Sequence, residues 1–346
     1  MPSRSLTLAG TLTTAAGLVL FAWLIWNAGP QAIWRGVGQV GWGLLAVFAI
    51  AGVRFAVRAA AWIRCLEPPH TLGLAEGFAA VVSGDAIGNA TPLGPLVSEP
   101  AKVAFVRRRV PLGAAFTALA IENVFYTLSV AAVIAAGTIA LLLRGGVGSS
   151  VKLVAEAAIV AILGGYVAAA WTLWRRPAVL SSAVAFAGRV WRSPALEGRL
   201  EKIQKLEHDI YTFAARRRGA VGALIAMELL FHALGVLEVH LTLWLLLGGP
   251  PPLLTSFILE TANRLITVVF KFVPMQQPGL NEASTVLVAH ALGLSTPIAG
   301  TLAIVRRARM LFWQLAGTAL LVRRGVSTRR ILDDAELRNR RPAVNG

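Results

Sequence analysis

Long apolar stretches separated by short basic clusters dominate this chain. A helix that crosses a bilayer needs about 20 mainly apolar residues. The stretches that meet this requirement are residues 8–28, 39–63, 112–143, 153–174, 219–247 and 296–322. The pattern therefore predicts an all-α polytopic membrane protein with about six spanning helices.

Two further apolar segments, residues 72–108 and 252–293, are each interrupted near the middle by proline and glycine. Proline stops a helix because it removes a hydrogen-bond donor and clashes with the preceding turn. The predicted structural breaks are Pro92, Gly94, Pro274, Pro278 and Gly279. We expect each segment to form a re-entrant helical hairpin; two additional full spans, about eight in all, are the alternative.

Composition and charge support a membrane location. Charged residues make up 14% of the 346 residues and hydrophobic residues 56%, and the mean hydropathy is +0.67. A soluble domain would carry about 25% charged residues, so much of this chain must face lipid. The net charge of +16 would suggest nucleic acid in a soluble protein. Here the basic residues flank apolar runs, where they orient helices and meet anionic headgroups, so no nucleic-acid partner is expected.

Basic residues concentrate in the segment 176–218, which the positive-inside rule places in the cytoplasm. Counting spans outward from this segment places the N-terminus and the tail at 325–346 on the same side. The apolar spacing over residues 197–217 predicts an amphipathic helix on the membrane surface.

The two interrupted segments resemble each other in order and spacing. Glu99 precedes Glu122 by 23 positions, and Glu282 precedes Arg306 by 24. The predicted repeat units are residues 1–151 and 152–324. Each unit holds an odd number of true crossings, so the second would enter the membrane from the opposite face. Inverted repeats with broken helices place a polar site near the midplane, whereas chance recurrence in a chain rich in small apolar residues is the alternative.

Charged residues inside apolar segments are the main candidates for function, because each costs about 2.5–3.5 kcal/mol at the bilayer centre. Glu260, Arg264 and Lys271 fall within about 40° on one helical face, so we expect them to face the protein interior. A structural Glu260–Arg264 pair that only ties helices together is the alternative. Lys271 is harder to explain in that way, because the pair already balances its own charge.

Five more charged residues complete the predicted substrate-binding set. They are Glu99, Glu122, Glu282, Arg306 and Arg307. Glu99 and Glu282 would begin the returning half-helices, where the helix dipole favours carboxylates. Glu122 lies in a long uncharged run and should be either protonated or paired with a basic residue of another unit. Arginine is the usual phosphate ligand, so Arg306 and Arg307 suggest anion recognition.

Other polar residues receive lesser roles. Arg54 and Arg58 lie near one end of their helix and are expected to reach the interface as anchors. Glu228 and His232 share a helical face, and such residues can bind zinc. However, Glu238 points away from them and no HExxH pattern occurs, so no metal and no other cofactor is expected.

Several short motifs resemble the transmembrane region of lysylphosphatidylglycerol synthases, also called the flippase-like domain. They are Ser98-Glu99-Pro100-Ala101-Lys102, Ala120-Ile121-Glu122-Asn123 and the block from Val273 to Ala283. The resemblance covers nearly the whole chain and implies movement of an amphiphilic lipid between the leaflets of a bacterial inner membrane. Full-length relatives add a domain that attaches lysine to the lipid. We expect this chain to lack it, so the resemblance implies a transporter rather than an enzyme.

Three functions are compatible with these patterns. The first is a lipid translocase whose hairpins line a path for the headgroup, with anionic or zwitterionic membrane lipids as partners. The second is an integral-membrane enzyme that modifies a lipid. The third is a non-catalytic scaffold that binds lipid-synthesis enzymes. The first is favoured because buried charge and broken hairpins are typical of transporters, and the oligomeric state is left open.

Overall fold

The computed structural model describes Trp26 and residues 30–90, 94–145, 149–175, 216–269 and 280–323, with a few isolated positions between 182 and 213. Its helices are α2 (Pro30–Val40), α3 (Gly43–Cys65), α4 (Leu74–Ala90), α5 (Gly94–Phe105), α6 (Leu112–Arg144), α7 (Ser149–Arg175), α11 (Arg218–Leu247), α12 (Leu253–Val269), α13 (Leu280–Ala291) and α14 (Thr296–Arg323). No strand occurs within these described ranges. The predicted all-α fold class is therefore confirmed.

Three of the described helices, α3, α6 and α11, are long and apolar enough to cross a membrane. They coincide with three predicted spans, those at 39–63, 112–143 and 219–247. The protein is therefore a polytopic membrane protein, as its hydropathy pattern predicted.

Two more predicted spans, 153–174 and 296–322, correspond to α7 and α14. At 27 and 28 residues, each helix would reach about 40 Å, although the arginines in the middle of α14 make it less apolar. The predicted first span at 8–28 and the predicted surface helix at 197–217 lie mostly outside the described residues.

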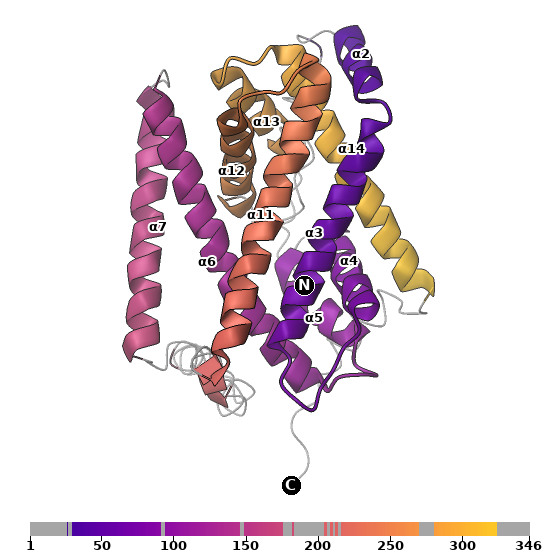
Figure 1. Cartoon of the computed structure of the whole chain (residues 1–346), viewed down its shortest axis with the longest axis vertical. Coiled ribbons are helices and arrows are strands. Elements are labelled where there is room, and N and C mark those ends of the chain that lie inside the picture. The colour runs from indigo at the N-terminus through magenta and orange to yellow at the C-terminus, as the bar shows by residue number, and fades with distance from the viewer. Residues whose placement is uncertain are drawn as a thin grey trace, which may run out of the picture.

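Both interrupted segments form pairs of short helices, α4 with α5 and α12 with α13. Gly94 begins α5, as expected for the residue after a break. The other predicted breaks, Pro92, Pro274, Pro278 and Gly279, lie outside the described residues. Figure 1 shows the α4–α5 hairpin near one end of the long helices and the α12–α13 hairpin near the other. The two hairpins therefore meet the bundle from opposite ends.

The lengths of the hairpin helices favour re-entrant hairpins over full spans. α5 and α13 have 12 residues each, or about 18 Å, whereas the hydrocarbon core is about 30 Å thick. Small residues bring α4 and α5 together. A Cβ atom on Gly88 would lie 2.9 Å from Cβ of Ser98 and 3.1 Å from the carbonyl oxygen of Gly94. Close approach of this kind is how helices associate where no water drives them together.

Reciprocal contacts organise the bundle. The long helices α3 and α11 pack side by side and run antiparallel (Figure 1). α14 packs against α4, and α6 packs against α12. When α3–α6 are matched in order with α11–α14, the α4–α14 contact becomes the α12–α6 contact. This exchange of helices is the packing expected of two structurally related units.

Two hydrophobic cores surround the hairpins, and charged side chains lie between them. Helix α11 illustrates this order, because it passes through both cores. Leu224 belongs to the core around α4 and α5, and Leu243 to the core around α12 and α13. The buried polar residues Glu228, His232 and Glu238 lie between these two positions. The bundle thus holds a layer of charge halfway along its length.

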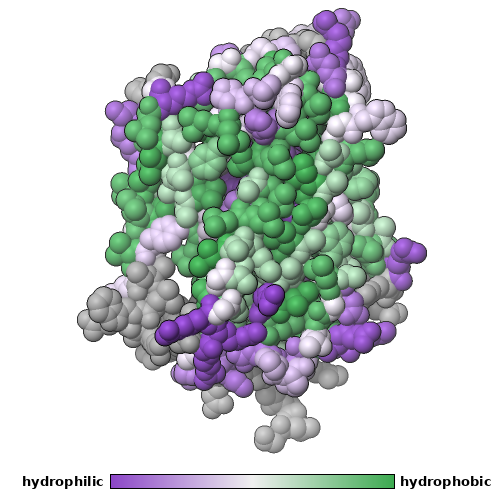
Figure 2. Space-filling view, in the orientation of Figure 1, coloured by the Kyte–Doolittle hydropathy of each residue, from purple (hydrophilic) through white to green (hydrophobic). Residues whose placement is uncertain are grey.

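The outer surface carries the apolar band that a bilayer requires. Figure 2 shows a broad hydrophobic band across the middle of the visible face, with hydrophilic residues at both ends. Large apolar side chains such as Val167, Leu229 and Leu315 are 61–71% exposed. An exposed apolar surface of this extent is stable only in contact with lipid or protein.

Candidate functional site

Glu260 of α12 lies at the centre of the first group of buried charges. Its carboxylate oxygens lie 2.9 Å from Nη2 of Arg264, 3.0 Å from Nη2 of Arg306 and 3.7 Å from Nη2 of Arg54. These arginines come from α12, α14 and α3 respectively. Glu260 and Arg264 face the protein interior, and the ion pair between them that the sequence suggested is present. Arg306 joins it from a different helix.

Glu238 of α11 extends this group. Its Oε2 lies 3.1 Å from Nη1 of Arg54 and 2.8 Å from Nη1 of Arg309. We call the whole set the arginine cluster; it consists of Arg54, Glu238, Glu260, Arg264, Arg306 and Arg309. Four guanidinium groups face two carboxylates, so the cluster holds two positive charges in excess.

The arginine cluster also holds polar hydrogens without acceptors. Nε of Arg54, Nε of Arg264 and Nη1 of Arg306 are buried and have no hydrogen-bond partner among the described residues. Leaving a buried donor unsatisfied costs about 1–3 kcal/mol, and more for charged groups. Because such donors are rare in folded proteins, several in one cluster indicate a place built to receive an acceptor.

Phe231 of α11 stabilises part of this positive charge. The guanidinium carbons of Arg54 and Arg264 lie 4.6 Å and 5.0 Å from the centre of its ring, and that of Arg58 lies 5.8 Å away. The face of an aromatic ring attracts cations, by about 2 kcal/mol or more when water is excluded. The ring therefore keeps these arginines close together without neutralising them.

Gly235, one turn further along α11, leaves room for the same arrangement. A Cβ atom at this position would lie 2.6 Å from Oε1 of Glu260 and 3.0 Å from Nη2 of Arg264. Any larger residue would push against the ion pair itself. The absence of a side chain at Gly235 therefore allows α12 to place its charges against α11.

A second group of charges lies beside the α4–α5 hairpin. Arg58 of α3 binds Glu122 of α6 through two contacts, Nε to Oε1 at 2.7 Å and Nη2 to Oε2 at 3.1 Å. Lys102 of α5 lies 3.1 Å from both Asp85 and Glu99. We call these five residues the hairpin cluster. Glu122 is therefore paired with a basic residue, as one of the two expectations had it. The partner is Arg58 of α3, within the same predicted unit, so the expectation that it would come from another unit is wrong.

The hairpin glutamates contact the helix that follows each hairpin. Asn123 Nδ2 of α6 donates a hydrogen bond of 3.1 Å to Glu99. Arg307 Nη1 of α14 lies 3.3 Å from Glu282. Glu282 lies in the first turn of α13, as expected, whereas Glu99 is the sixth residue of α5 and lies beyond its first turn. Each glutamate nevertheless contacts the helix that follows its hairpin. Lys271 lies outside the described residues.

The anchoring role expected for Arg54 and Arg58 is wrong. Their side chains are only 13% and 14% exposed, and both form ion pairs with buried glutamates. Their partners Glu238 and Glu122 lie 184 and 64 positions away, so a reading of one helix could not reveal them. Sequence reasoning also missed Lys102, although a lysine after a predicted break was a usable signal.

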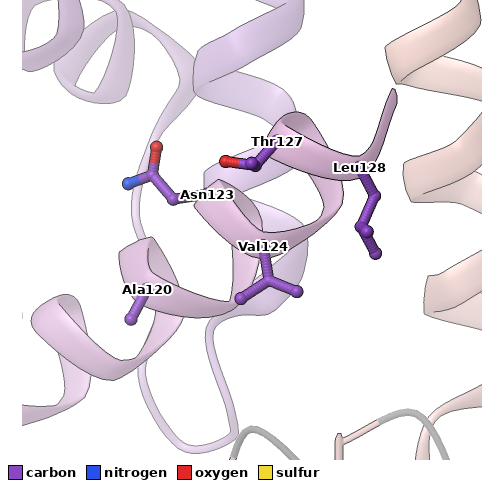
Figure 3. Close-up of a pocket in the computed structure, with 5 residues that line it drawn as sticks. All are labelled: Ala120, Asn123, Val124, Thr127 and Leu128. Carbon is purple, nitrogen blue, oxygen red and sulfur yellow. The ribbon is translucent and has the colours of Figure 1, made fainter. Parts of the chain in front are cut away.

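A pocket of about 320 Å³ opens on α6 next to the hairpin cluster. It is lined by Ala120, Asn123, Val124, Thr127 and Leu128. Figure 3 shows these side chains along one face of α6, with the polar Asn123 and Thr127 toward one edge of that face and the three apolar side chains toward the other. Because Asn123 also donates a hydrogen bond to Glu99, the pocket adjoins the hairpin cluster.

Comparison with known proteins places these residues in one family. A family model described as the lysylphosphatidylglycerol synthase TM region matches residues 8–317. The match includes both hairpins and every residue of the two clusters. No curated protein and no solved structure matches the chain.

Proposed function

The chain belongs to the lysylphosphatidylglycerol synthase transmembrane-region family, a family of membrane proteins that handle lipids, and from this premise we propose that it moves a lipid with an anionic phosphate headgroup between leaflets. The arginine cluster carries the proposal. It buries two uncompensated positive charges and several unsatisfied guanidinium donors halfway through the bundle. No purely structural ion-pair network needs that excess.

Phosphate suits this cluster better than other headgroup chemistry. Guanidinium presents its N–H groups in a planar fork that matches the oxygens of a phosphate. A hydrogen bond to a charged group contributes about 1.5–3 kcal/mol, so two or three such bonds would offset much of the cost of bringing a phosphate into the bilayer. We assign this role to Arg264 and Arg306, together with Lys271.

The carboxylates have a complementary role in the proposal. Glu99, Glu122 and Glu282 would neutralise cationic parts of a zwitterionic headgroup as it moves past the hairpins. Hairpins at opposite ends, with reciprocal helix contacts, support two inverted units, residues 1–151 and 152–324, that rock to alternate access. The α6 pocket supports a sideways route from the lipid to the hairpin cluster, because its lining is mostly apolar while Asn123 at its edge contacts Glu99.

Transport can be tested directly in reconstituted vesicles. Purified protein is placed in liposomes that contain a phosphatidylglycerol with a fluorescent headgroup-proximal label, and dithionite then bleaches only the outer leaflet. We expect wild-type protein to make the inner pool bleachable over time. Vesicles without protein should keep that pool protected.

Arg306→Gln and Arg264→Gln test the arginine cluster itself. Each removes one charge, yet Glu260 keeps other arginines within 4 Å, so the fold should survive. We expect the transport rate to fall about tenfold or more, which corresponds to one charge-assisted hydrogen bond. Arg109→Gln is the matched control, since Arg109 is 69% exposed. Equal rates for Arg306→Gln and Arg109→Gln would refute the assignment.

We also propose that the protein is not an enzyme, and that it lies in a bacterial inner membrane with both termini in the cytoplasm. The alternatives of a lipid-modifying enzyme and a scaffold for lipid-synthesis enzymes predict different lipid inventories. An enzyme changes the total amount of a lipid, whereas a translocase changes the distribution of a lipid between leaflets. If the protein is a scaffold, neither Glu99→Gln nor Glu282→Gln should alter the amount or the distribution.

A further inference from the structure

A third buried polar group lies between α6 and α11, outside both clusters. Oγ of Ser129 on α6 lies 3.1 Å from Oε2 of Glu228 and 3.0 Å from Nε2 of His232, both on α11. Glu228 and His232 are only 3% and 4% exposed. They lie ten and fourteen residues after the start of a 30-residue helix at Arg218, so this group is near the middle of the span.

Glu228 differs from the other buried carboxylates. The four others in the described ranges are Glu122, Glu238, Glu260 and Glu282, and each has an arginine within 4 Å. No lysine or arginine among the described residues lies at that distance from Glu228. Its Oε1 is buried without a hydrogen-bond partner, and so is Nδ1 of His232.

Three charged groups face Glu228 from neighbouring helices at longer range. They are Arg58 of α3, Glu122 of α6 and Arg264 of α12. Arg58 is already bound to Glu122, and Arg264 to Glu260. An ionised carboxylate without a direct partner at this depth costs several kcal/mol, and such a group becomes neutral instead. Glu228 therefore holds a proton.

Ser129 gives that proton a route. A hydroxyl group has one donor and two acceptor positions. The hydroxyl hydrogen of Ser129 can point to the Tyr126 carbonyl oxygen, 2.8 Å away, or to Nε2 of His232, 3.0 Å away. In the second arrangement the carboxyl proton of Glu228 can pass to Oγ of Ser129 while the hydroxyl's own proton passes to Nε2 of His232. One O–H bond of Glu228 breaks and one N–H bond of His232 forms, so the hydroxyl is regenerated. A carboxylate and an imidazolium result. The imidazolium faces three arginines, Arg54, Arg58 and Arg264, and one carboxylate, Glu260, so the net positive charge around it favours release of the proton.

We propose that Glu228, Ser129 and His232 form a proton-binding site that couples lipid movement to a proton gradient. The inference rests on the proposed function, because coupling requires a transported lipid. Once Glu228 has lost its proton, its charge attracts Arg264, one of the arginines assigned to the phosphate. Deprotonation therefore competes with the headgroup for the same guanidinium, and reprotonation frees it for the next cycle.

The same three residues do not support a nucleophilic serine. In a serine hydrolase the carboxylate binds Nδ1 of the histidine and orients it toward the serine. Here the carboxylate contacts the serine, and Nδ1 of His232 has no hydrogen-bond partner in the described part of the chain. The geometry fits proton exchange between Glu228 and His232 and lacks the support that acyl transfer requires.

The experiment uses the labelled-lipid vesicles with a pH difference of one unit across the membrane. With one proton per lipid, the gradient should bias the steady-state ratio of labelled lipid between leaflets by up to about tenfold. We expect this bias in the wild type and its loss in Glu228→Gln. Glu76→Gln, a substitution at a half-buried residue in the first turn of α4, is the matched control and should keep the bias.

Infrared spectroscopy provides a second readout that needs no transport. A protonated carboxylic acid in an apolar site has its own carbonyl band. We expect that band in wild-type protein in detergent at neutral pH and its loss in Glu228→Gln, while circular dichroism shows the same helix content for both.

The outcomes separate this inference from the proposed function. A wild type that moves no lipid refutes the translocase, and the infrared band then still reports whether Glu228 holds a proton. A wild type that moves lipid with no bias from the gradient, or a Glu228→Gln variant that keeps the full bias, refutes the coupling. A carboxylic acid band that Glu228→Gln leaves unchanged refutes the proton site.

Discussion

Removal of Arg58 is the most direct test of how this protein tolerates buried charge. Arg58 binds Glu122 through two contacts, at 2.7 Å and 3.1 Å, and Glu122 is only 1% exposed. Arg58→Met keeps much of the side-chain volume but leaves Glu122 as a buried carboxylate without its cation. Breaking a buried ion pair from one side typically costs about 3–5 kcal/mol.

The structure also sets the comparisons for this experiment. The double variant Arg58→Met, Glu122→Met replaces both charges with apolar groups, so most of the loss should be recovered. Arg109→Met removes a similar contact, 3.2 Å to Glu76, at the surface, and should cost about 0–1 kcal/mol. We therefore expect Arg109→Met to be the most stable of the three variants, the double variant to be intermediate and Arg58→Met to be the least stable.

The assay is unfolding by sodium dodecyl sulfate in mixed micelles, followed by tryptophan fluorescence. A loss of about 3 kcal/mol raises the equilibrium constant for unfolding by more than a hundredfold, which is well within reach of the measurement. The reasoning is refuted if Arg58→Met is no less stable than Arg109→Met. It is also refuted if the double variant is as unstable as Arg58→Met alone, because the stranded charge would then not be the cause.

Three further predictions follow from the same geometry. Gly235→Ala should lower the lipid transport rate because its Cβ atom enters the arginine cluster. Gly222→Ala on the same helix is the control, because no described atom lies within 4 Å of its Cβ position, and equal rates for the two variants would contradict the proposed site. Glu99→Gln and Glu282→Gln should each reduce labelled-lipid movement while size-exclusion profiles stay unchanged, and normal transport in both would remove the hairpin glutamates from the mechanism. A cysteine at Gly145, in a background without the native cysteine, should react with a membrane-impermeant maleimide from outside the cell only, and labelling from the cytoplasm would reverse the proposed orientation.

Much of the fold could be predicted because the signals are local. The apolar stretches at 39–63, 112–143 and 219–247 became α3, α6 and α11 almost residue for residue, since lipid imposes the same length and hydropathy on any spanning helix. Gly94 marked the start of α5 because glycine and proline act on the backbone at their own position.

The candidate site was only partly predictable. Glu260 and Arg264 share one helix face, so their pairing could be read from a spacing of four. The contacts of Glu238 with Arg54 and Arg309 were not predicted, because each joins residues of helices that lie far apart along the chain. The anchoring role of Arg54 failed for the same reason, since position along a helix says nothing about which neighbour faces it.

The amino-acid sequence by itself determined that this protein lies in a bilayer, which segments are broken into two helices, and which charges must be sheltered from lipid. These properties depend on the free energy of each residue in its own segment. Only the tertiary structure decided which charges meet, that four arginines outnumber two glutamates in one cluster, and that no lysine or arginine of the described residues lies within ion-pair distance of Glu228. Those facts depend on how helices rotate and pack against each other, because an ion pair needs two side chains within about 4 Å whatever their distance along the chain.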